Sequence, residues 1–94
     1  MDQKTILLVE DNPDDEELTL MALKKNNILN RVAVVRDGIE ALDYLFGRGK
    51  YEAHEPPVLP DVVLLDLKLP KLGGLEVLER IRSDARTAFL PVVI

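Results

Sequence analysis

The chain has 94 residues, enough for one small domain, and 47% of them are hydrophobic and 31% charged, as in ordinary globular proteins. Its net charge of −5 argues against a nucleic-acid binder or a protein of anionic membrane surfaces. The absence of cysteine excludes disulfides, thiolate metal sites and a cysteine nucleophile. We see no signal peptide and no apolar run long enough to span a bilayer, so we expect a cytoplasmic chain with no membrane partner.

The chain begins with a buried strand that is followed by a capped helix. Residues 4–9 contain the apolar run Ile6–Val9, which is typical of a strand buried on both faces. Asn12 is a good helix cap, Pro13 suits the first helical position, and the acids that follow favour the positive end of a helix dipole. These signals predict a helix over residues 14–26. Its predicted inner face is apolar and comprises Leu18, Met21 and Ala22, widened by Leu20 and Leu23.

The middle of the chain repeats this pattern and then loses its periodicity. Residues 31–36 contain a second Val-rich run, and residues 38–46 carry apolar side chains at helical spacing, so we predict a strand and a helix. The apolar positions of this helix are Ile39, Leu42, Leu45 and Phe46. From 47 to 60, glycines, prolines and mixed charge predict a solvated loop that Tyr51 holds to the body of the domain. His54 has no ligand cluster and is expected to be an ordinary loop residue.

The last part of the chain predicts two more strands and a helix between them. Residues 62–65 form an unbroken apolar run that leads straight into Asp66, which predicts a strand buried on both faces. Residues 74–83 predict a helix, and residues 90–94 begin a fourth strand. The predicted inner positions of the helix are Leu75, Leu78 and either Ile81 or Arg82. Strands that alternate with short helices imply an α/β fold with a parallel sheet, right-handed crossovers and helices on both faces.

Two of the predicted strands end in acids. Glu10 and Asp11 follow the first strand, and Asp66 follows the third. If these strands are neighbours in the sheet, the three carboxylates meet at the edge where parallel sheets collect ligands. Like charges so close need either a retained proton or a bound cation. Mg²⁺ prefers such oxygen ligands, and it would neutralise the charge that develops as a phosphoryl group moves to Asp66.

Each acid also has a purely structural interpretation. Glu10 and Asp11 could serve only to start the helix, but Asn12 already supplies a better cap. Asp66 alone could be a turn-forming residue, so it is the joint pattern that favours a site. The acids of residues 14–17 are expected to complement the helix dipole. Nucleophilic catalysis by a hydroxyl is unsupported, because no base is near in sequence to Thr19, Ser83 or Thr87.

These motifs resemble those of response-regulator receiver domains. The pair Glu10-Asp11 is similar to the metal-binding pair of that family, and Leu64–Pro70 with Gly74 is similar to its phosphoacceptor strand and the turn that follows. The resemblance covers the whole chain and implies a flavodoxin-like three-layer sandwich with strand order 2-1-3-4. The segment from residue 47 to 60 resembles stand-alone receivers that are paired with bacterial phytochromes.

The resemblance implies a phosphoacceptor and not a turnover enzyme. Asp66 would take a phosphoryl group from a sensor histidine kinase, here of the phytochrome type, with Mg²⁺ as cofactor, and the domain would then switch conformation. The implied metal ligands are Asp11, Asp66 and the backbone carbonyl of Lys68, with Glu10 acting mainly through water. Family members continue with a Thr or Ser, a Lys, one more strand and two more helices. We therefore expect residues 1–94 to be a single receiver domain that is incomplete at its C-terminus.

Other functions remain open from the sequence. A receiver fragment could keep the fold and the metal site and serve only as a structural or assembly module. A phosphatase with an Asp nucleophile would want a second acid two residues after Asp66, where this chain has Lys68. A flavin or nucleotide binder would need a Gly- or Ser/Thr-rich phosphate loop after the first strand, and residues 10–14 are acidic instead.

The fourth predicted strand also raises the question of self-association. In a sheet of order 2-1-3-4, residues 92–94 would form an apolar edge with unpaired backbone groups, and part of one sheet face would be uncovered. We therefore expect a homodimer that covers either this edge or this face.

Overall fold

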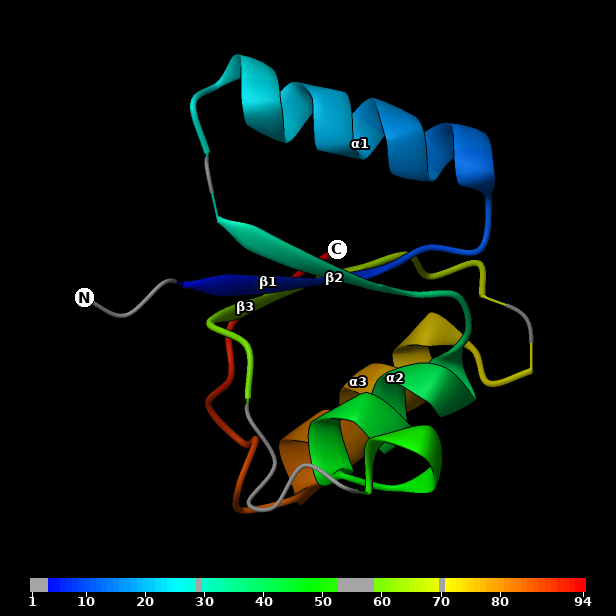
Figure 1. Cartoon of the computed structure of the whole chain (residues 1–94). Helices are drawn as coiled ribbons and strands as arrows, with labels where there is room; N and C mark the ends of the chain where they lie inside the picture. Colours follow the sequence, from blue (N-terminus) through cyan, green and yellow to red (C-terminus); the bar gives the residue numbers. More distant parts are fainter. Residues whose placement is uncertain (1–3, 29, 53–58, 70) are drawn as a thin grey trace.

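The computed structural model describes residues 4–28, 30–52, 59–69 and 71–94. Four parallel strands form one sheet in the order β2-β1-β3-β4, with α1 on one face and α2 and α3 on the other (Figure 1). This arrangement confirms the flavodoxin-like fold and strand order that the sequence predicts. The elements are β1 (Thr5–Val9), α1 (Pro13–Lys25), β2 (Arg31–Val35), α2 (Gly38–Phe46), the 3₁₀ turn η1 (Gly49–Tyr51), β3 (Val62–Leu65), α3 (Gly74–Ser83) and β4 (Val92–Val93).

Strand β1 lies between β2 and β3, and its register brings the carboxyl ends of the three strands level. Val9 lies opposite Val35 on one side and opposite Leu65 on the other. The next amides extend the ladder: the Glu10 N–H donates to the Val35 carbonyl at 3.0 Å, and the Asp66 N–H donates to the Val9 carbonyl at 3.2 Å. Glu10 and Asp66 therefore leave neighbouring strands at the same edge of the sheet.

The hydrophobic core lies on the face that α2 and α3 cover. Its fully or nearly buried members are Leu7, Val9, Val35, Ala41, Leu42, Leu45, Val63, Leu65, Val77, Ile81 and Leu90. The opposite face is thinner, because α1 is the only described helix on it and a helix about 10 Å wide covers roughly two strands. Val62 and Leu64 of β3 are only half-buried there, so the prediction that this strand is buried on both faces was wrong.

Helix α1 begins and ends as its capping residues dictate. The Asn12 side-chain oxygen accepts hydrogen bonds from the amides of Asp14 at 2.8 Å and Asp15 at 3.3 Å, and Pro13 occupies the first helical position. Asn26 is the C-terminal cap. The helix is therefore shifted by one residue toward the N-terminus relative to the prediction of 14–26.

The predicted inner face of α1 was wrong at Leu18, Met21 and Ala22 and correct at Leu20 and Leu23. Leu18 and Met21 are 63% and 60% exposed, and the half-buried positions of the helix are Glu16, Thr19, Leu20 and Leu23. Five apolar residues lie between positions 18 and 23 of α1 and surround most of its circumference, so their spacing does not select one stripe. The side that faces the sheet is fixed by the direction in which the chain leaves β1, which the periodicity does not encode.

Helices α2 and α3 each present one regular stripe to the core. The buried positions are Gly38, Ala41, Leu42 and Leu45 in α2 and Gly74, Val77 and Ile81 in α3. Ile39 and Leu75 were predicted to face inward, but they are 50% and 67% exposed. Each follows a buried glycine by one position, which rotates its side chain by about 100° away from the core.

The segment after α2 is held by an aromatic contact and a hydrogen bond. Gly47 ends the helix with φ of 65°, a left-handed conformation that glycine adopts readily. The Tyr51 hydroxyl then donates to Glu40 Oε2 at 3.0 Å, and its ring meets Tyr44 edge-on with centroids 5.1 Å apart. The prediction that Tyr51 anchors this segment is confirmed, whereas His54 lies outside the described residues.

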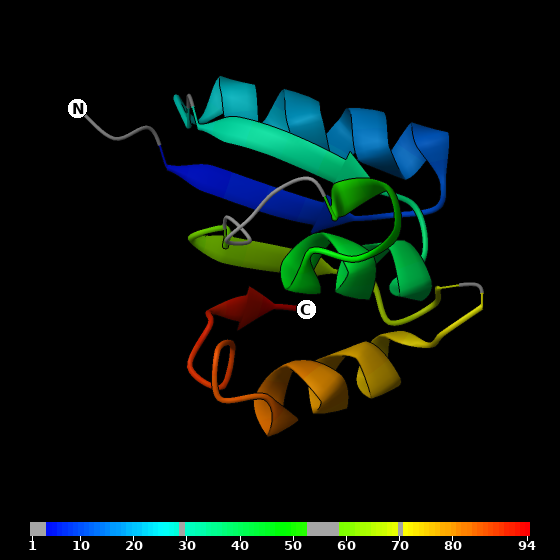
Figure 2. The ribbon, with the colours of Figure 1, turned by 60° about the horizontal axis from the view of Figure 1, so that its bottom comes forward.

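Strand β4 forms the edge of the sheet beside β3 (Figure 2). It covers only Val92–Val93 instead of the predicted residues 90–94. Before it, the Arg82 guanidinium donates to the carbonyls of Ala88 at 3.1 Å and Leu90 at 2.7 Å, which fixes the turn between α3 and β4. Within the described ranges, no helix has the length and apolar character needed to cross a membrane.

Candidate functional site

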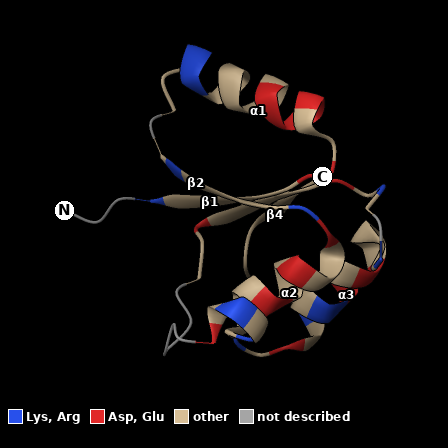
Figure 3. Cartoon of the chain, turned by 45° about the vertical axis from the view of Figure 1, so that its right-hand side comes forward, with Lys and Arg blue, Asp and Glu red and all other residues tan. Residues whose placement is uncertain are grey.

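Three carboxylates meet at the carboxyl edge of the sheet. Glu10 and Asp11 follow β1, Asp66 follows β3, and one carboxylate oxygen of each lies within 4.8 Å of the others. Among the described residues, this is the one cluster of three side chains of the metal-binding types. The acidic first turn of α1 lies at the same end of the sheet (Figure 3). The convergence expected from the two strand ends is therefore present in the structure.

The three acids have different surroundings. Glu10 is buried, with one side-chain oxygen accepting from the Asn12 amide at 3.3 Å, whereas Asp11 is exposed. Asp66 is half-buried and accepts a hydrogen bond from the Lys68 amide at 2.9 Å. Burial raises the pKa of the Glu10 carboxyl, and nearby Asp66 and Asp15 raise it further, although the Asn12 amide opposes them. Negative charge at this edge is thus poorly compensated by the chain itself.

The donor set fits a small divalent cation. Carboxylate oxygens are the ligands that Mg²⁺ and Mn²⁺ accept, and a cation would relieve the repulsion that raises the pKa of Glu10. The Lys68 amide donates a hydrogen bond to Asp66, and this bond keeps the Lys68 backbone near the cluster. Its carbonyl remains a predicted ligand.

Asp15 is a neighbour of the site that the sequence did not identify. The acids of residues 14–17 were expected only to complement the helix dipole, yet Asp15 raises the pKa of Glu10 and lines the groove beside it. The only sequence feature that places Asp15 near the site is its position three residues after the helix cap Asn12. The hydroxyls of Ser83 and Thr87 lie elsewhere and donate to the carbonyls of Glu79 and Ile81. Thr19 lines the same groove as Asp15.

A groove of about 380 Å³ opens beside Asp66 on the α1 side of the sheet. Its lining is acidic at one end and apolar at the other, and consists of Leu8, Val9, Glu10, Asp15, Thr19, Leu64, Leu65, Asp66, Val93 and Ile94. Asp66 therefore borders a groove that is open to solvent.

The segment after Asp66 passes very close to the start of α3. A Cβ atom on Gly74 would lie 2.6 Å from the Asp66 carbonyl oxygen, so no larger residue fits there without a shift of the backbone. The Gly74 amide donates to the Leu67 carbonyl at 3.3 Å. Gly74, noted in the sequence as part of the family motif, thus permits this close approach, while Pro70 of the same motif lies outside the described residues.

Comparison with known families agrees with this geometry. Residues 6–94 match the response regulator receiver domain. The chain belongs to this family. In this receiver, the acidic pair after β1 and the acid after β3 that the sequence singled out lie at one edge of the sheet.

Three relatives of this receiver show how far the similarity extends. Response regulator Rcp1 of Synechocystis sp. (strain ATCC 27184 / PCC 6803 / Kazusa) is 41% identical over 91 residues, which is 97% of this chain and 60% of Rcp1. A structure of Rcp1 in an Mn²⁺-bound form has a TM-score of 0.84 and covers 95% of this chain and 62% of that one, at 39% identity. The receiver therefore spans less than two thirds of this relative.

The other two relatives are known from solved structures. The bacteriophytochrome response regulator AtBRR is 54% identical with a TM-score of 0.91, over 99% of this chain and 66% of that chain. The phosphorylated cyanobacterial phytochrome response regulator RcpA is 44% identical with a TM-score of 0.84, over 97% of this chain and 63% of that chain. The similarity to receivers of phytochrome systems, noted first in residues 47–60, extends through the described fold.

Proposed function

We propose that this receiver accepts a phosphoryl group on Asp66 with the help of a divalent cation, and that residues 1–94 act as one receiver domain. The observation that carries the proposal is the convergence of the carboxylates of Glu10, Asp11 and Asp66 within 4.8 Å at the open edge of the sheet. Support also comes from two relatives, one solved with Mn²⁺ bound and the other in a phosphorylated form.

The proposed cation is Mg²⁺, held by Asp11, Asp66 and the Lys68 carbonyl, with Glu10 acting through water. When bound, it supplies positive charge to the oxygens of the transferring phosphoryl group. An Asp66 carboxylate oxygen attacks phosphorus, the phosphorus–nitrogen bond of a donor phosphohistidine breaks, and the imidazole nitrogen takes a proton. The Lys68 amide, 2.9 Å from Asp66 Oδ1, keeps the carboxylate oriented during attack.

The proposed phosphoryl donor is a sensor histidine kinase of the phytochrome type. The proposed compartment is the cytoplasm, where such kinases take their phosphoryl group from ATP. The high identity with AtBRR and RcpA supports the choice of kinase class. The proposed role is that of an acceptor which switches conformation, not of an enzyme that releases a product. A phosphatase is disfavoured because Lys68 occupies the position of the second acid, and Lys68 is exposed.

We also propose that the receiver forms a homodimer. Val93 on the edge strand and Ile94 just after it are 54% and 64% exposed, and Leu18 and Met21 on α1 present further apolar surface on the same side of the sheet. A two-fold contact would pair the strand edge or cover this face.

The test is incubation with acetyl phosphate and Mg²⁺, followed by intact-mass analysis. We expect one added phosphoryl group that is stable in acid, labile in base, and absent when EDTA is present. Asp66→Ala should abolish the addition, whereas Asp14→Ala, which removes an exposed acid of α1, should not. Addition that persists in Asp66→Ala would refute the proposal. Calorimetric Mg²⁺ binding without any addition would favour the structural-module alternative.

A further inference from the structure

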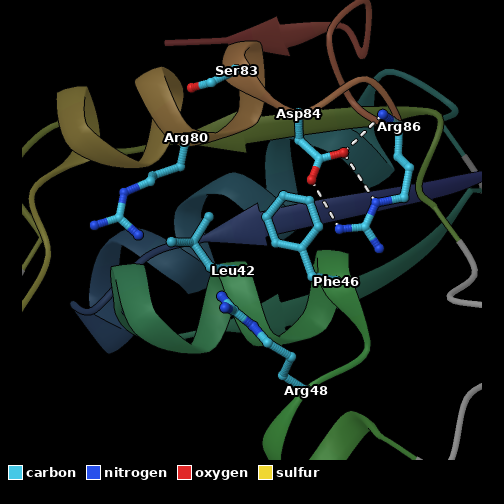
Figure 4. A pocket seen from close by; sticks show the side chains of 7 residues that line it. All are labelled: Leu42, Phe46, Arg48, Arg80, Ser83, Asp84 and Arg86. Atoms are coloured by element: carbon cyan, nitrogen blue, oxygen red, sulfur yellow. Dashed lines mark hydrogen bonds and ion pairs between the residues drawn. The ribbon is translucent and has the colours of Figure 1, made fainter.

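A second cleft lies between α2 and α3, on the side of the molecule opposite to α1 (Figure 4). It consists of two adjoining cavities of about 300 and 370 Å³ that share Leu42, Arg48 and Arg80. None of these residues belongs to the carboxylate site. The cleft follows α2, whose nine residues span about 13 Å at 1.5 Å per residue. An extended peptide of about four residues would fill this length.

The floor of the cleft is apolar. Leu42 and Phe46 of α2 line one cavity, and Ile39 and Leu72 extend the apolar surface into the other. Ile39, which the sequence placed in the core, is half exposed and faces this cleft instead. Phe46 and Leu72 are half-buried, whereas Leu42 is nearly fully buried and belongs to the core. Accessible apolar side chains in a concave surface, such as Ile39 here, are the usual floor of a peptide-binding site.

The rim of the cleft is basic although the chain is acidic overall. Three arginines and two aspartates line it, namely Arg48, Arg80, Arg86, Asp43 and Asp84. Arg86 is held by Asp84 through two side-chain hydrogen bonds of 3.0 and 2.9 Å, and Arg48 lies 3.7 Å from Asp43. Within the described part of the chain, Arg80 makes no hydrogen bond or ion pair, so its planar guanidinium is available to a ligand carboxylate.

Aromatic ligands fit this cleft less well than acidic peptides. The guanidinium of Arg86 lies 4.8 Å and that of Arg48 5.5 Å from the centre of the Phe46 ring. A stacked nucleobase would have to displace one of these groups. Carboxylates can meet the guanidinium groups without disturbing Phe46.

We propose that the α2–α3 cleft binds an acidic peptide segment of a partner protein, in which an aliphatic side chain lies between carboxylates. The aliphatic side chain packs on Ile39, Leu42 and Leu72, and a carboxylate accepts hydrogen bonds from Arg80. Arg48 and Arg86, preoriented by their aspartates and by Phe46, flank the bound segment. The recognition is of charge and apolar surface together, so neither feature alone is sufficient.

The test uses a fluorescein-labelled short peptide in which glutamate alternates with leucine, measured by fluorescence anisotropy with the unmodified chain. We expect saturable binding that weakens at least about tenfold in Arg80→Glu, since a charge-assisted hydrogen bond is lost and repulsion is added. Arg31→Glu is the matched control, because it makes the same charge change at an exposed position at the start of β2, and it should bind like the unmodified chain. Peptides with glutamine for glutamate, or alanine for leucine, should bind more weakly.

Three results would overturn the proposal: no saturable binding by the unmodified chain, equal weakening by Arg80→Glu and Arg31→Glu, or amide shifts confined to α1 in an NMR titration with the same peptide. The expected NMR result is shifts in α2 and α3, around Ile39, Leu42 and Arg80. Thermal melting should show that Arg80→Glu folds normally, because Arg80 is exposed and unpaired within the described residues. The titration contains neither Mg²⁺ nor a phosphoryl donor, so this test is independent of phosphotransfer.

Discussion

Gly38, the first residue of α2, packs tightly against Leu72 in the segment that follows Asp66. A Cβ atom at this position would lie 2.2 Å from the Leu72 carbonyl oxygen and 2.8 Å from a Val77 methyl group. Both clashes involve groups that cannot move far, since one is backbone and the other belongs to a buried core residue. Glycine is needed here for close packing and not for an unusual backbone conformation.

Gly38→Ala should therefore lower the free energy of unfolding by on the order of 1–3 kcal/mol through overpacking. The measurement is urea unfolding followed by circular dichroism. Gly73→Ala is the matched control, because a Cβ there would meet nothing within 4 Å, and its stability should be close to that of the unmodified chain. Equal stability of both variants would contradict the packing argument.

Asp66→Asn should weaken Mg²⁺ binding at least about tenfold, because it removes both a proposed ligand and a negative charge. Isothermal titration calorimetry provides the measurement, with Asp14→Asn as a control for loss of one charge near the same edge. A wild-type chain that gives no Mg²⁺ signal at millimolar concentration would show that the metal site does not assemble.

Glu40 links three parts of the chain at the scale of whole elements. Its carboxylate accepts hydrogen bonds from the Arg36 amide at 2.9 Å and the Tyr51 hydroxyl at 3.0 Å, and Lys50 Nζ lies 2.7 Å away. Burial alone would raise the pKa of Glu40, but the hydrogen bond from Lys50 and those from Arg36 and Tyr51 outweigh it and lower the pKa. The end of β2, the helix α2 and the turn η1 are joined at this side chain.

Because the pKa of Glu40 is lowered, its contribution to the free energy of unfolding depends on pH. Glu40 stabilises the folded chain above its ordinary pKa of 4.5, and the contribution is lost as the pH falls through the lower folded-state value. Glu40→Gln should therefore cost about 1 kcal/mol near pH 7 and much less near pH 3, measured by urea unfolding at both values. Glu76→Gln, at an exposed position of α3, should show no such difference. A cost that is the same at both pH values would exclude the charge as its source.

The elements were predicted well where local chemistry determines them and poorly where it does not. The ends of α1 followed from Asn12 and Pro13, because capping needs only neighbouring residues. The inner faces of α1, α2 and α3 were partly wrong, since Leu18, Ile39 and Leu75 are apolar but lie outside the buried stripe. An apolar side chain can be buried, but whether it is buried depends on the neighbours that pack against it.

The whole molecule is unevenly covered. One face of the sheet carries α2, α3 and the core, while the other carries α1 and the exposed Leu18, Met21, Val93 and Ile94. At about 25 cal/mol per Å², a few hundred Å² of uncovered apolar surface forgoes several kcal/mol. That is comparable with the whole stability of a small domain, about 5–15 kcal/mol. Association that covers this side would therefore stabilise the fold substantially.

Val93→Lys should shift the proposed homodimer to monomers if β4 pairs edge to edge, because charge on an edge strand opposes pairing. Met21→Lys should do so instead if the uncovered face is the contact. Analytical ultracentrifugation over a range of concentrations distinguishes these outcomes, with Leu75→Lys on α3 as a control that should leave the dimer intact. A wild-type chain that stays monomeric at high micromolar concentration would refute the dimer.

The carboxylate cluster and the α2–α3 cleft differ in how well the sequence predicts them. The carboxylate cluster was predictable because parallel strands end at one edge, so Glu10, Asp11 and Asp66 needed only neighbouring strands to meet. The α2–α3 cleft combines side chains from the two helices and the segments beside them, and its shape depends on how those helices pack. No motif marks Arg80 as different from the other arginines.

The position of Leu72 ties these two sites together. Leu72 follows Asp66 in the same connecting segment, packs against Gly38 and forms part of the wall of the α2–α3 cleft, while the adjacent Lys71 pairs with Asp37 at 3.3 Å. A ligand at the carboxylates that displaces this segment must change the affinity of the cleft. Thermodynamic reciprocity then requires an occupant of the cleft to change the affinity for Mg²⁺ by the same factor. If the proposed metal site is correct, a partner bound far from Asp66 would thus set how much Mg²⁺ is needed to fill the carboxylate site.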